Sequence, residues 1–417
     1  MTQAFHTGIS GVKTHQSGMN VTADNLANIS TVGFRASNTE FASLYEKSLN
    51  THNGLGSVTS TTGSGTRLQA TTMQTTQGAL MSSERNTDLA IAGSGWFGVQ
   101  KSGDVHFSRA GDFGFDANGN LVTPDGYGVL GSMGGNIDNG ELSEVLDSVP
   151  LDGVNAQQKL QFPQTLIYPA EATTEAFFGG NIGKGDEPVK MGANVFDSSG
   201  DKNELMLTFT KVDSEDESGM QWQVEAVVSS KDGEVFDTQE GVVSFDETGG
   251  LTANTLGALN NNGADLNVNL GDAFSGIVSQ TNRSLSSSSS TNGVAQGDLI
   301  DYEINRNGEV LALFSNGKQS SVGRVAVFHF ANEQGLERAG SARFTQSSNS
   351  GDPFFHVDDN GQNYLGSTIM SRTLENSNAK MDVSLTEMII MQRAFDANSK
   401  SITTADQLIQ KALQMNA

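Results

Sequence analysis

Cysteine is absent from the 417 residues of this chain, and proline is scarce at 6 residues. The lack of cysteine excludes disulfides, thiol nucleophiles and cysteine metal sites together. The sequence has no run of about 18 apolar residues, so it predicts no transmembrane helix and no membrane insertion. Its N-terminal segment lacks the charged start and continuous apolar core of a cleaved signal peptide. We therefore expect a cytosolic protein, or one exported by a route that reads no such signal.

Basic residues are also few, with 24 Lys and Arg against 48 Asp and Glu, which gives a net charge of −24. Nucleic acid and anionic membranes both require a cationic protein surface, so the composition argues against either as a partner. Residues 1–35 and 380–417 are close to neutral, and the acidic excess therefore lies between them. This distribution predicts ends that pack together and a middle that faces water.

Glycine is abundant at 48 residues, as is typical of a protein rich in turns. In the middle of the chain, apolar and polar residues alternate between turns of Gly, Asn and Asp. This pattern predicts strands within residues 89–131, 204–212, 220–230, 241–251 and 301–330. Because strand follows strand without a helical pattern between them, we expect mostly antiparallel sheets. The serine run Ser286–Ser290 is interpreted as an exposed linker.

Each end of the chain carries a narrow apolar seam at helical spacing. The N-terminal seam is Phe5, Ile9, Val12, Gln16, Met19, Ala23 and Leu26. The C-terminal seam is Ser384, Met388, Met391, Phe395, Asn398, Ile402, Ala405, Ile409 and Ala412, widened by Leu385, Ile389, Leu408 and Leu413. Seams this narrow fit another helix better than the flat face of a sheet, although two amphipathic helices on a globular core are the plainer alternative.

The predicted fold class is therefore α+β, with N- and C-terminal helices that pair as a coiled coil and two mostly antiparallel all-β domains between them. The "SLTE" sequence at 384–387 has the form of a capping box, although the helix could begin a turn earlier. The expected divisions are a helical domain (1–35 plus 375–417), an extended linker-like region (36–72), a β domain (73–149 plus 298–374) and an inserted outer β domain (150–297).

The sequence contains no constellation that we would assign to catalysis. Residues 93–98 form a GxGxxG pattern, but a strand and a turn follow where a nucleotide site needs a helix, so a glycine-rich hairpin is favoured. The Asp–Asn–Gly clusters at 116–120, 197–204 and 358–363 do not have the spacing of a calcium loop and fit hairpin turns. We expect no cofactor, no metal and no enzymatic activity.

Three motifs, however, resemble signatures of the bacterial flagellar rod and hook proteins. "DNLANISTVGFRAS" at 24–37 is similar to the first signature, with Arg35 where lysine is common. "NTDLAIAGSGWFGVQ" at 86–100 resembles the second, with Gly98 where a larger residue is usual. "VSLTEMIIMQRAFDANSKSITTADQLIQKAL" at 383–413 resembles the C-terminal helix. The first signature maps onto Asn25, Leu26, Ala27, Asn28, Thr31, Gly33 and Phe34.

The resemblance implies a subunit of a tubular helical homopolymer outside the cell, exported by the flagellar type III apparatus. A chain above 400 residues with a large β insertion looks like the hook subunits of this family, which form a curved tube that transmits torque as a universal joint. The implied partners are copies of itself, rod and hook–filament junction proteins, the hook cap and the export apparatus. The expected interface between copies is Phe5, Ile9, Val12, Met19, Leu26, Leu385, Met388, Met391, Phe395, Ile402 and Ile409.

Two other functions stay open from the sequence. A distal rod subunit with an unusual insertion would form a straight, rigid polymer. A secreted, β-rich adhesin would account for the acidic middle, but it would leave both terminal seams without a role.

Overall fold

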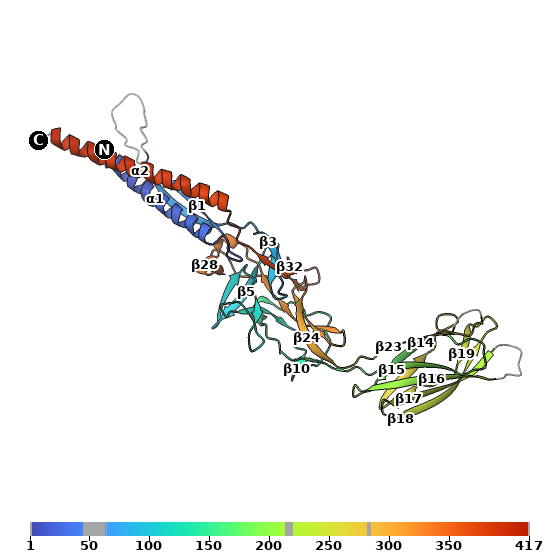
Figure 1. Cartoon of the computed structure of the whole chain (residues 1–417). Helices are drawn as coiled ribbons and strands as arrows, with labels where there is room; N and C mark the ends of the chain where they lie inside the picture. The colour runs from blue at the N-terminus through green and yellow to red at the C-terminus, as the bar shows by residue number, and fades with distance from the viewer. Residues whose placement is uncertain (1, 45–62, 64, 213–219, 282–284, 416–417) are drawn as a thin grey trace.

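The chain is elongated, and its three parts follow one another along its length (Figure 1). We describe it from a computed structural model that covers residues 2–44, 63, 65–212, 220–281 and 285–415. A pair of helices forms one end, a β domain follows, and a second β domain lies farthest from the helices. Both chain ends lie together at the helical end, so the second β domain is an insertion far from the termini.

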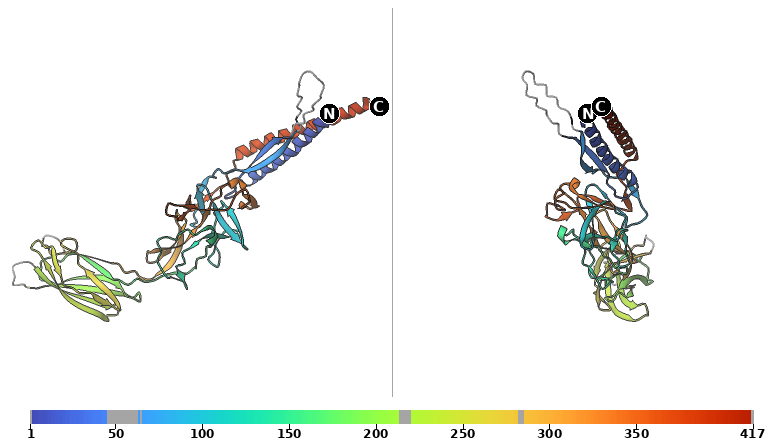
Figure 2. Two further views of the ribbon diagram at one scale, coloured as in Figure 1. Left: turned by 180° about the vertical axis from the view of Figure 1, so that it is seen from behind. Right: turned by 90° about the vertical axis from the view of Figure 1, so that its left-hand side faces the viewer.

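The helical end consists of α1 (Thr2–Ala27) and α2 (Met381–Met415), which lie side by side and antiparallel (Figures 1 and 2). No Gly or Pro interrupts α2, which explains its length. The backbone N–H of Ser384 donates to Lys380 O, so the helix begins one turn before the predicted capping box. The predicted α+β fold with paired terminal helices is confirmed.

The stretch expected as an extended linker, residues 36–72, contains a two-stranded antiparallel ribbon instead. Strand β1 (Ser37–Ser43) pairs with β2 (Thr66–Met73), while 45–62 and 64 lie outside the described residues. The ribbon rests on α1, where Thr14 Oγ1 donates to Thr66 O at 3.0 Å. The described parts of this region are ordered by packing on the helix beneath them, because an isolated two-stranded ribbon is only marginally stable.

The inner β domain is built on a fifteen-stranded sheet whose main path runs β10-β11-β13-β24-β25-β26-β9-β5-β6-β29-β28. Its core holds Trp96, Phe97, Phe113, Phe162 and Phe314, all almost fully buried. The sheet strands are β5 (Trp96–Lys101), β6 (Asp104–Ser108), β7 (Gly114–Phe115), β8 (Leu121–Val122), β9 (Gly128–Met133), β10 (Ile137–Asp138), β11 (Glu141–Leu142), β12 (Gln158–Lys159), β13 (Ile167–Tyr168), β24 (Gly297–Ile304), β25 (Glu309–Phe314), β26 (Gln319–Val325), β27 (Val327–Phe328), β28 (Glu337–Gly340) and β29 (Arg343–Thr345).

Six short strands complete this domain by pairing in twos. The three pairs are β3 (Leu80–Ser82) with β33 (Thr373–Glu375), β4 (Leu89–Ala92) with β32 (Thr368–Ser371), and β30 (His356–Val357) with β31 (Asn363–Tyr364). Two 3₁₀ turns, η1 (Val154–Ala156) and η2 (Glu333–Gly335), also belong to it. The last strands before α2 are therefore part of the inner β domain.

The outer β domain packs two five-stranded sheets around Trp222, Phe178, Phe209 and Phe245. One sheet is antiparallel throughout, whereas in the other β14 also pairs in parallel with β21 and β22. The strands are β14 (Glu175–Asn181), β15 (Val189–Phe196), β16 (Lys202–Val212), β17 (Met220–Ser230), β18 (Val235–Phe245), β19 (Leu251–Asn254), β20 (Leu259–Asn261), β21 (Ala264–Asn269), β22 (Ile277–Val278) and β23 (Ser286–Thr291).

The residues of the two hydrophobic cores indicate where the boundary between the β domains lies. Leu160, Phe162 and Tyr168 are buried in the inner core, although they lie beyond the boundary expected at residue 150. Val294 also packs in the inner core on the return of the chain. We therefore propose that the outer domain begins near Ala170 and ends just before Val294.

The serine run predicted as a linker is a strand, β23, paired antiparallel with β14. Its hydroxyls donate to backbone carbonyls on both sides: Ser288 to Gly179 O at 3.0 Å and Ser289 to Gly192 O at 2.9 Å. Gly179 lies on β14, whereas Gly192 lies on β15 at the edge of the other sheet. The prediction was wrong because the Ser289 hydroxyl donates a hydrogen bond to an edge strand of the other sheet, β15, which would otherwise be open. Composition alone does not reveal such a partner.

The Asp–Asn–Gly clusters form one recurring hairpin turn. In each, a single carboxylate oxygen of Asp116, Asp197 or Asp358 accepts the backbone N–H groups two and four residues later, at 2.7–2.9 Å. The following glycines Gly119, Gly200 and Gly361 have φ between 77° and 85°, which explains the residue type. The turn interpretation is confirmed at these three positions.

Candidate assembly site: the helical arm and its buried joint

Close approach of the two helices depends on glycine. Gly8, Gly11 and Gly18 are buried on the face of α1 that meets α2. A Cβ added at Gly8 would lie 2.7 Å from Ile402 Cγ1, and one at Gly11 would lie 2.5 Å from Asn398 Oδ1. Each glycine costs helix stability of about 1 kcal/mol relative to alanine, so tertiary packing must compensate for these positions.

The two predicted seams have different outcomes in the structure. Every C-terminal seam position from Ser384 to Ala412 is buried or half-buried, and this seam is the face that meets α1. In the N-terminal seam Phe5, Ile9, Val12, Met19 and Leu26 are only half-buried, and the fully buried line of α1 is Gly8, Gly11, Thr14, Gly18, Thr22 and Asn25. Apolar periodicity misses this line because small and polar residues make the close contact.

A further part of α2 is exposed in the single chain although it is apolar. Leu385 of the predicted interface is 44% exposed, so the structure does not place it against α1. The other strongly exposed apolar side chains of this helix are Met381, Val383, Ile389, Ile390, Leu408, Leu413 and Met415. Groups of exposed apolar side chains of this kind mark interaction surfaces.

The first signature forms the connection between α1 and the β ribbon. Asn25 is buried, and its amide both donates to Ser37 O at 2.7 Å and accepts from Ser37 N at 2.9 Å. Asn28 Nδ2 donates to Asp24 O, and its Oδ1 accepts from Thr31 Oγ1 at 3.1 Å. Phe34 is buried with Ala36 and Ala379 against the start of α2. The signature residues thus end the helix and direct the chain into β1.

Gly33 of the same signature has no room for a side chain. Its φ is +66°, its N–H donates to Glu375 O at 2.7 Å, and a Cβ would overlap the backbone nitrogen of Ala110. We expect Gly33→Ala to destabilise the inner β domain by more than the ~1–2 kcal/mol of left-handed strain alone, measured by chemical denaturation. Gly135→Ala is the matched control, because Gly135 has φ +67° and a Cβ added there would have no other atom within 4 Å. Equal losses in the two variants would contradict a role for the close backbone contact.

A buried ionic cluster, which we call the joint, lies where α2, the signature loop and the inner domain meet. Glu375 pairs with Arg35 at 3.0 Å and with Arg109 at 3.3 Å, and all three residues are at most 2% exposed. Both guanidinium groups lie within 6 Å of the Trp96 ring centroid. Burial lowers the pKa of Arg35, and burial together with the nearby Arg35 charge lowers the pKa of Arg109 to about 10.

Hydrogen bonds around the joint tie together three segments of the chain, near residues 35, 77 and 377. Arg35 donates to Thr76 O, and Gly78 N donates to Glu375 Oε1 at 2.8 Å. The Asn378 amide accepts from Ala36 N at 2.7 Å and donates to Thr76 O at 2.8 Å. These buried groups satisfy one another's hydrogen bonds and have no water to replace a lost partner. The network therefore fixes how the end of the β domain meets the start of α2.

Two functional candidates in this region were not found from the sequence. These are Asn378 and Arg338, which belong to none of the three sequence motifs. Arg338 donates to Arg35 O at 2.6 Å and lies over the rings of Phe34 and Phe344. Nothing local in "LERAG" distinguishes this arginine from a solvated one, since its partners come from far along the chain.

The second signature is explained by packing in the same region. Trp96 has its ring centroid 4.9 Å from that of Phe344, and it starts β5 directly after the turn that contains Gly93 and Gly95. A Cβ at Gly98 would overlap the Phe328 ring, which explains the small residue there. The GxGxxG pattern is followed by a strand, as expected for a hairpin.

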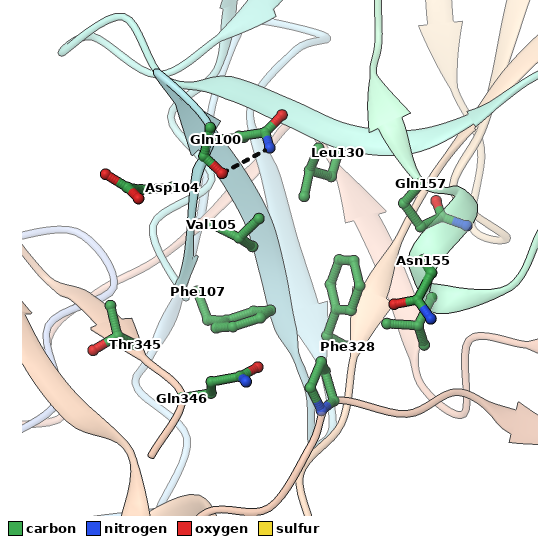
Figure 3. Close-up of a pocket in the computed structure, with 13 residues that line it drawn as sticks. Gln100, Asp104, Val105, Phe107, Leu130, Asn155, Gln157, Phe328, Thr345 and Gln346 are labelled. Atoms are coloured by element: carbon green, nitrogen blue, oxygen red, sulfur yellow. Dashed lines mark hydrogen bonds between the residues drawn. The ribbon is translucent and has the colours of Figure 1, made fainter.

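The inner domain has a cleft of about 480 Å³ beside β5 and β6 (Figure 3). Phe107, Phe328 and Leu130 lie at it, and amide side chains such as Gln100 and Gln157 surround them. Asp104 is its single carboxylate, with no His, Lys or Arg among the lining residues to form an acid–base pair. The described residues hold no group of three His, Asp or Glu side chains arranged for a metal. Neither described helix is long and apolar enough to cross a membrane.

A chain whose two ends form a glycine-packed helical arm, joined through a buried ionic cluster to β domains that extend away from it, has the architecture of a subunit of an axial helical polymer. Family models match most of it: "Flagella basal body rod protein" at 5–35, "Flagellar hook protein FlgE/F/G D1 domain" at 90–166, "Flagellar basal body protein FlaE D2 domain" at 189–351 and "Flagellar basal body rod FlgEFG protein C-terminal" at 370–415.

The full-length relatives are hook proteins. The chain is 32% identical to the flagellar hook protein FlgE of Brucella suis, over 97% of this chain and 96% of that protein. It is 27% identical to the hook protein FlgE of Borreliella burgdorferi, over 100% of both. The crystal structure of Helicobacter pylori FlgE2 shares the fold, with a TM-score of 0.51 at 18% identity over 71% of this chain and all of that chain. The chain belongs to the flagellar hook protein family.

Proposed function

We propose that this chain is the structural subunit of a bacterial flagellar hook, which self-assembles into a flexible curved tube that transmits motor torque from rod to filament. The observation that carries the proposal is the match to hook proteins along almost the whole chain, including the family model at 189–351, which covers most of the outer domain. The paired helices are suited to the inner wall of the tube, and the acidic outer domain to its hydrated surface.

The interface between copies is proposed to use the terminal helices. The half-buried side chains of the N-terminal seam flank the glycine contact and retain apolar surface to bury against a neighbour. Each such residue buried on assembly contributes about 1.5–3 kcal/mol. The proposed residues are Phe5, Ile9, Val12, Met19, Leu26, Leu385, Met388, Met391, Phe395, Ile402 and Ile409.

The further partners proposed for the tube are rod proteins at its base, junction proteins at the filament and a cap during growth. The chain is proposed to leave the cell through the flagellar type III apparatus without a cleaved signal peptide. No catalytic step is proposed, because torque transmission needs only a polymer whose subunits slide past one another at the outside while the inner helices stay packed.

Immunogold electron microscopy of cells tests the function directly, with an antibody raised against residues 170–293. We expect label confined to a short curved segment at the base of each filament. A rod subunit would leave the hook unlabelled, and an adhesin would be labelled over the whole cell surface. Either of these patterns would refute the hook assignment.

A further inference from the structure

Two exposed patches lie at opposite ends of α2. The proximal patch is Met381, Asp382, Val383, Leu385, Ile389 and Ile390 beside the joint, and the distal patch is Leu408, Lys411, Leu413 and Met415 at the far end. We propose that these patches bind each other between copies, so that the distal patch of one subunit packs on the proximal patch of the next. The inference rests on the proposed function, because it names the contact by which hook subunits join.

The distal patch is exposed because α2 is longer than α1. Gly8 lies opposite Ile402 and Gly18 opposite Met391, so the start of α1 at Thr2 falls near residue 408 of α2. The last two turns of α2 therefore extend beyond α1, as Figures 1 and 2 show. In these turns Leu408, Leu413 and Met415 are 52%, 66% and 81% exposed.

The proximal patch is exposed although it lies next to a well-packed joint. Its five apolar side chains, within ten residues, are 44–59% exposed. Ser384 and Met388 face α1, whereas Leu385, Ile389 and Ile390 lie on other sides of the helix. Exposed apolar side chains therefore lie on more than one side of this segment, and a further molecule would remove them from water.

Charge favours a second copy as the occupant. The proximal patch contains Asp382, with Lys380 just before the helix, and the distal patch contains Lys411, with Asp406 five residues before it. Asp382 is exposed at the helix start, and Lys411 is exposed between the apolar side chains of the distal patch. Asp382 of one copy can therefore pair with Lys411 of the next copy, and each chain contains both patches.

The geometry also predicts the type of assembly. A contact between two different patches is heterologous, and unless its rotation closes a ring it adds subunits without limit. The patches are about 36 Å apart along α2, from the 24 residues between Ile389 and Leu413, so one chain cannot satisfy both by itself. The contact therefore propagates from copy to copy as a hook requires.

Cysteine cross-linking tests the contact. No native thiol can form a competing disulfide, because the natural chain has no cysteine. We would assemble the full-length Ile389→Cys/Leu413→Cys variant under reducing conditions, oxidise the polymer, and run it on a non-reducing denaturing gel. The expected result is a ladder of dimers, trimers and longer chains. An intramolecular disulfide is impossible, because bridged Cα atoms lie within about 7 Å. Each single variant is a matched control and should stay monomeric on the gel.

The possible outcomes separate this inference from the proposed function. A normal polymer that gives no ladder, both with this pair and with a second pair, Leu385→Cys/Leu408→Cys, overturns the head-to-tail contact and leaves the hook assignment standing. Dimers from Leu413→Cys alone overturn it too, because they mean that distal patches pack on each other. Failure of the unchanged chain to polymerise would count against the proposed function itself.

Discussion

Ile402→Asp is expected to abolish hook assembly while leaving the outer β domain folded. Ile402 lies against Gly8 in the close contact between the two helices, where an added Cβ at Gly8 would lie 2.7 Å from Ile402 Cγ1. The α1 sequence has a single Lys or Arg, Lys13, and it is exposed. Burying an unpaired carboxylate costs several kcal/mol. We expect this cost to exceed the net stability of the packed helix pair. Counting hooks by electron microscopy in cells that express only the variant measures the effect, and Phe395→Asp should behave in the same way.

Ile402→Val is the matched control, because it keeps an apolar β-branched side chain and typically costs only about 0.5–1.5 kcal/mol. It should support hooks of normal number and length. Since Trp222 reports on the outer core and is far from the helices, its fluorescence should be unchanged in the Asp variant. Normal hooks made of Ile402→Asp would mean that the helical arm is not what holds copies together.

Glu375→Gln is expected to destabilise the inner β domain by about 3–5 kcal/mol, because it leaves two guanidinium groups buried without a counter-charge. Burial already lowers the pKa of Arg35 and Arg109, which means that the folded protein holds both charges at a cost. The carboxylate of Glu375 offsets that cost at 3.0 Å and 3.3 Å. Chemical denaturation followed by near-UV circular dichroism measures the loss.

The outer domain has a core of its own, so its transition provides an internal reference within the same experiment. Glu337→Gln is the control substitution, since Glu337 is exposed on β28 and makes no side-chain ion pair among the described residues. Its effect should stay within about 0.5 kcal/mol. If Glu375→Gln were equally mild, the joint would not depend on this charge, and the rigid connection between α2 and the β domain would need another explanation.

Local patterns in the sequence were sufficient for the class of fold. The 3.6-residue periodicity at both ends and the alternation between them identified the helices and most long strands, because such patterns depend on neighbours in sequence. Turns such as the one at Asp116 were also predictable, since the carboxylate bonds backbone groups only two and four residues away. The ribbon of β1 and β2 and the strand β23 were not, because each is stabilised by surfaces that other segments supply.

By itself, then, the sequence determined two terminal helices, an acidic β-rich middle and membership of the rod and hook family. Only the tertiary structure decided which face of α1 meets α2, because a close helical contact selects Gly8, Gly11 and Gly18 and not the large apolar residues that periodicity detects. The joint likewise cannot be recognised from the sequence. Arg35, Arg109 and Glu375 each look like ordinary charged residues until folding removes all three from water together, and a buried charge is stable only beside its partner.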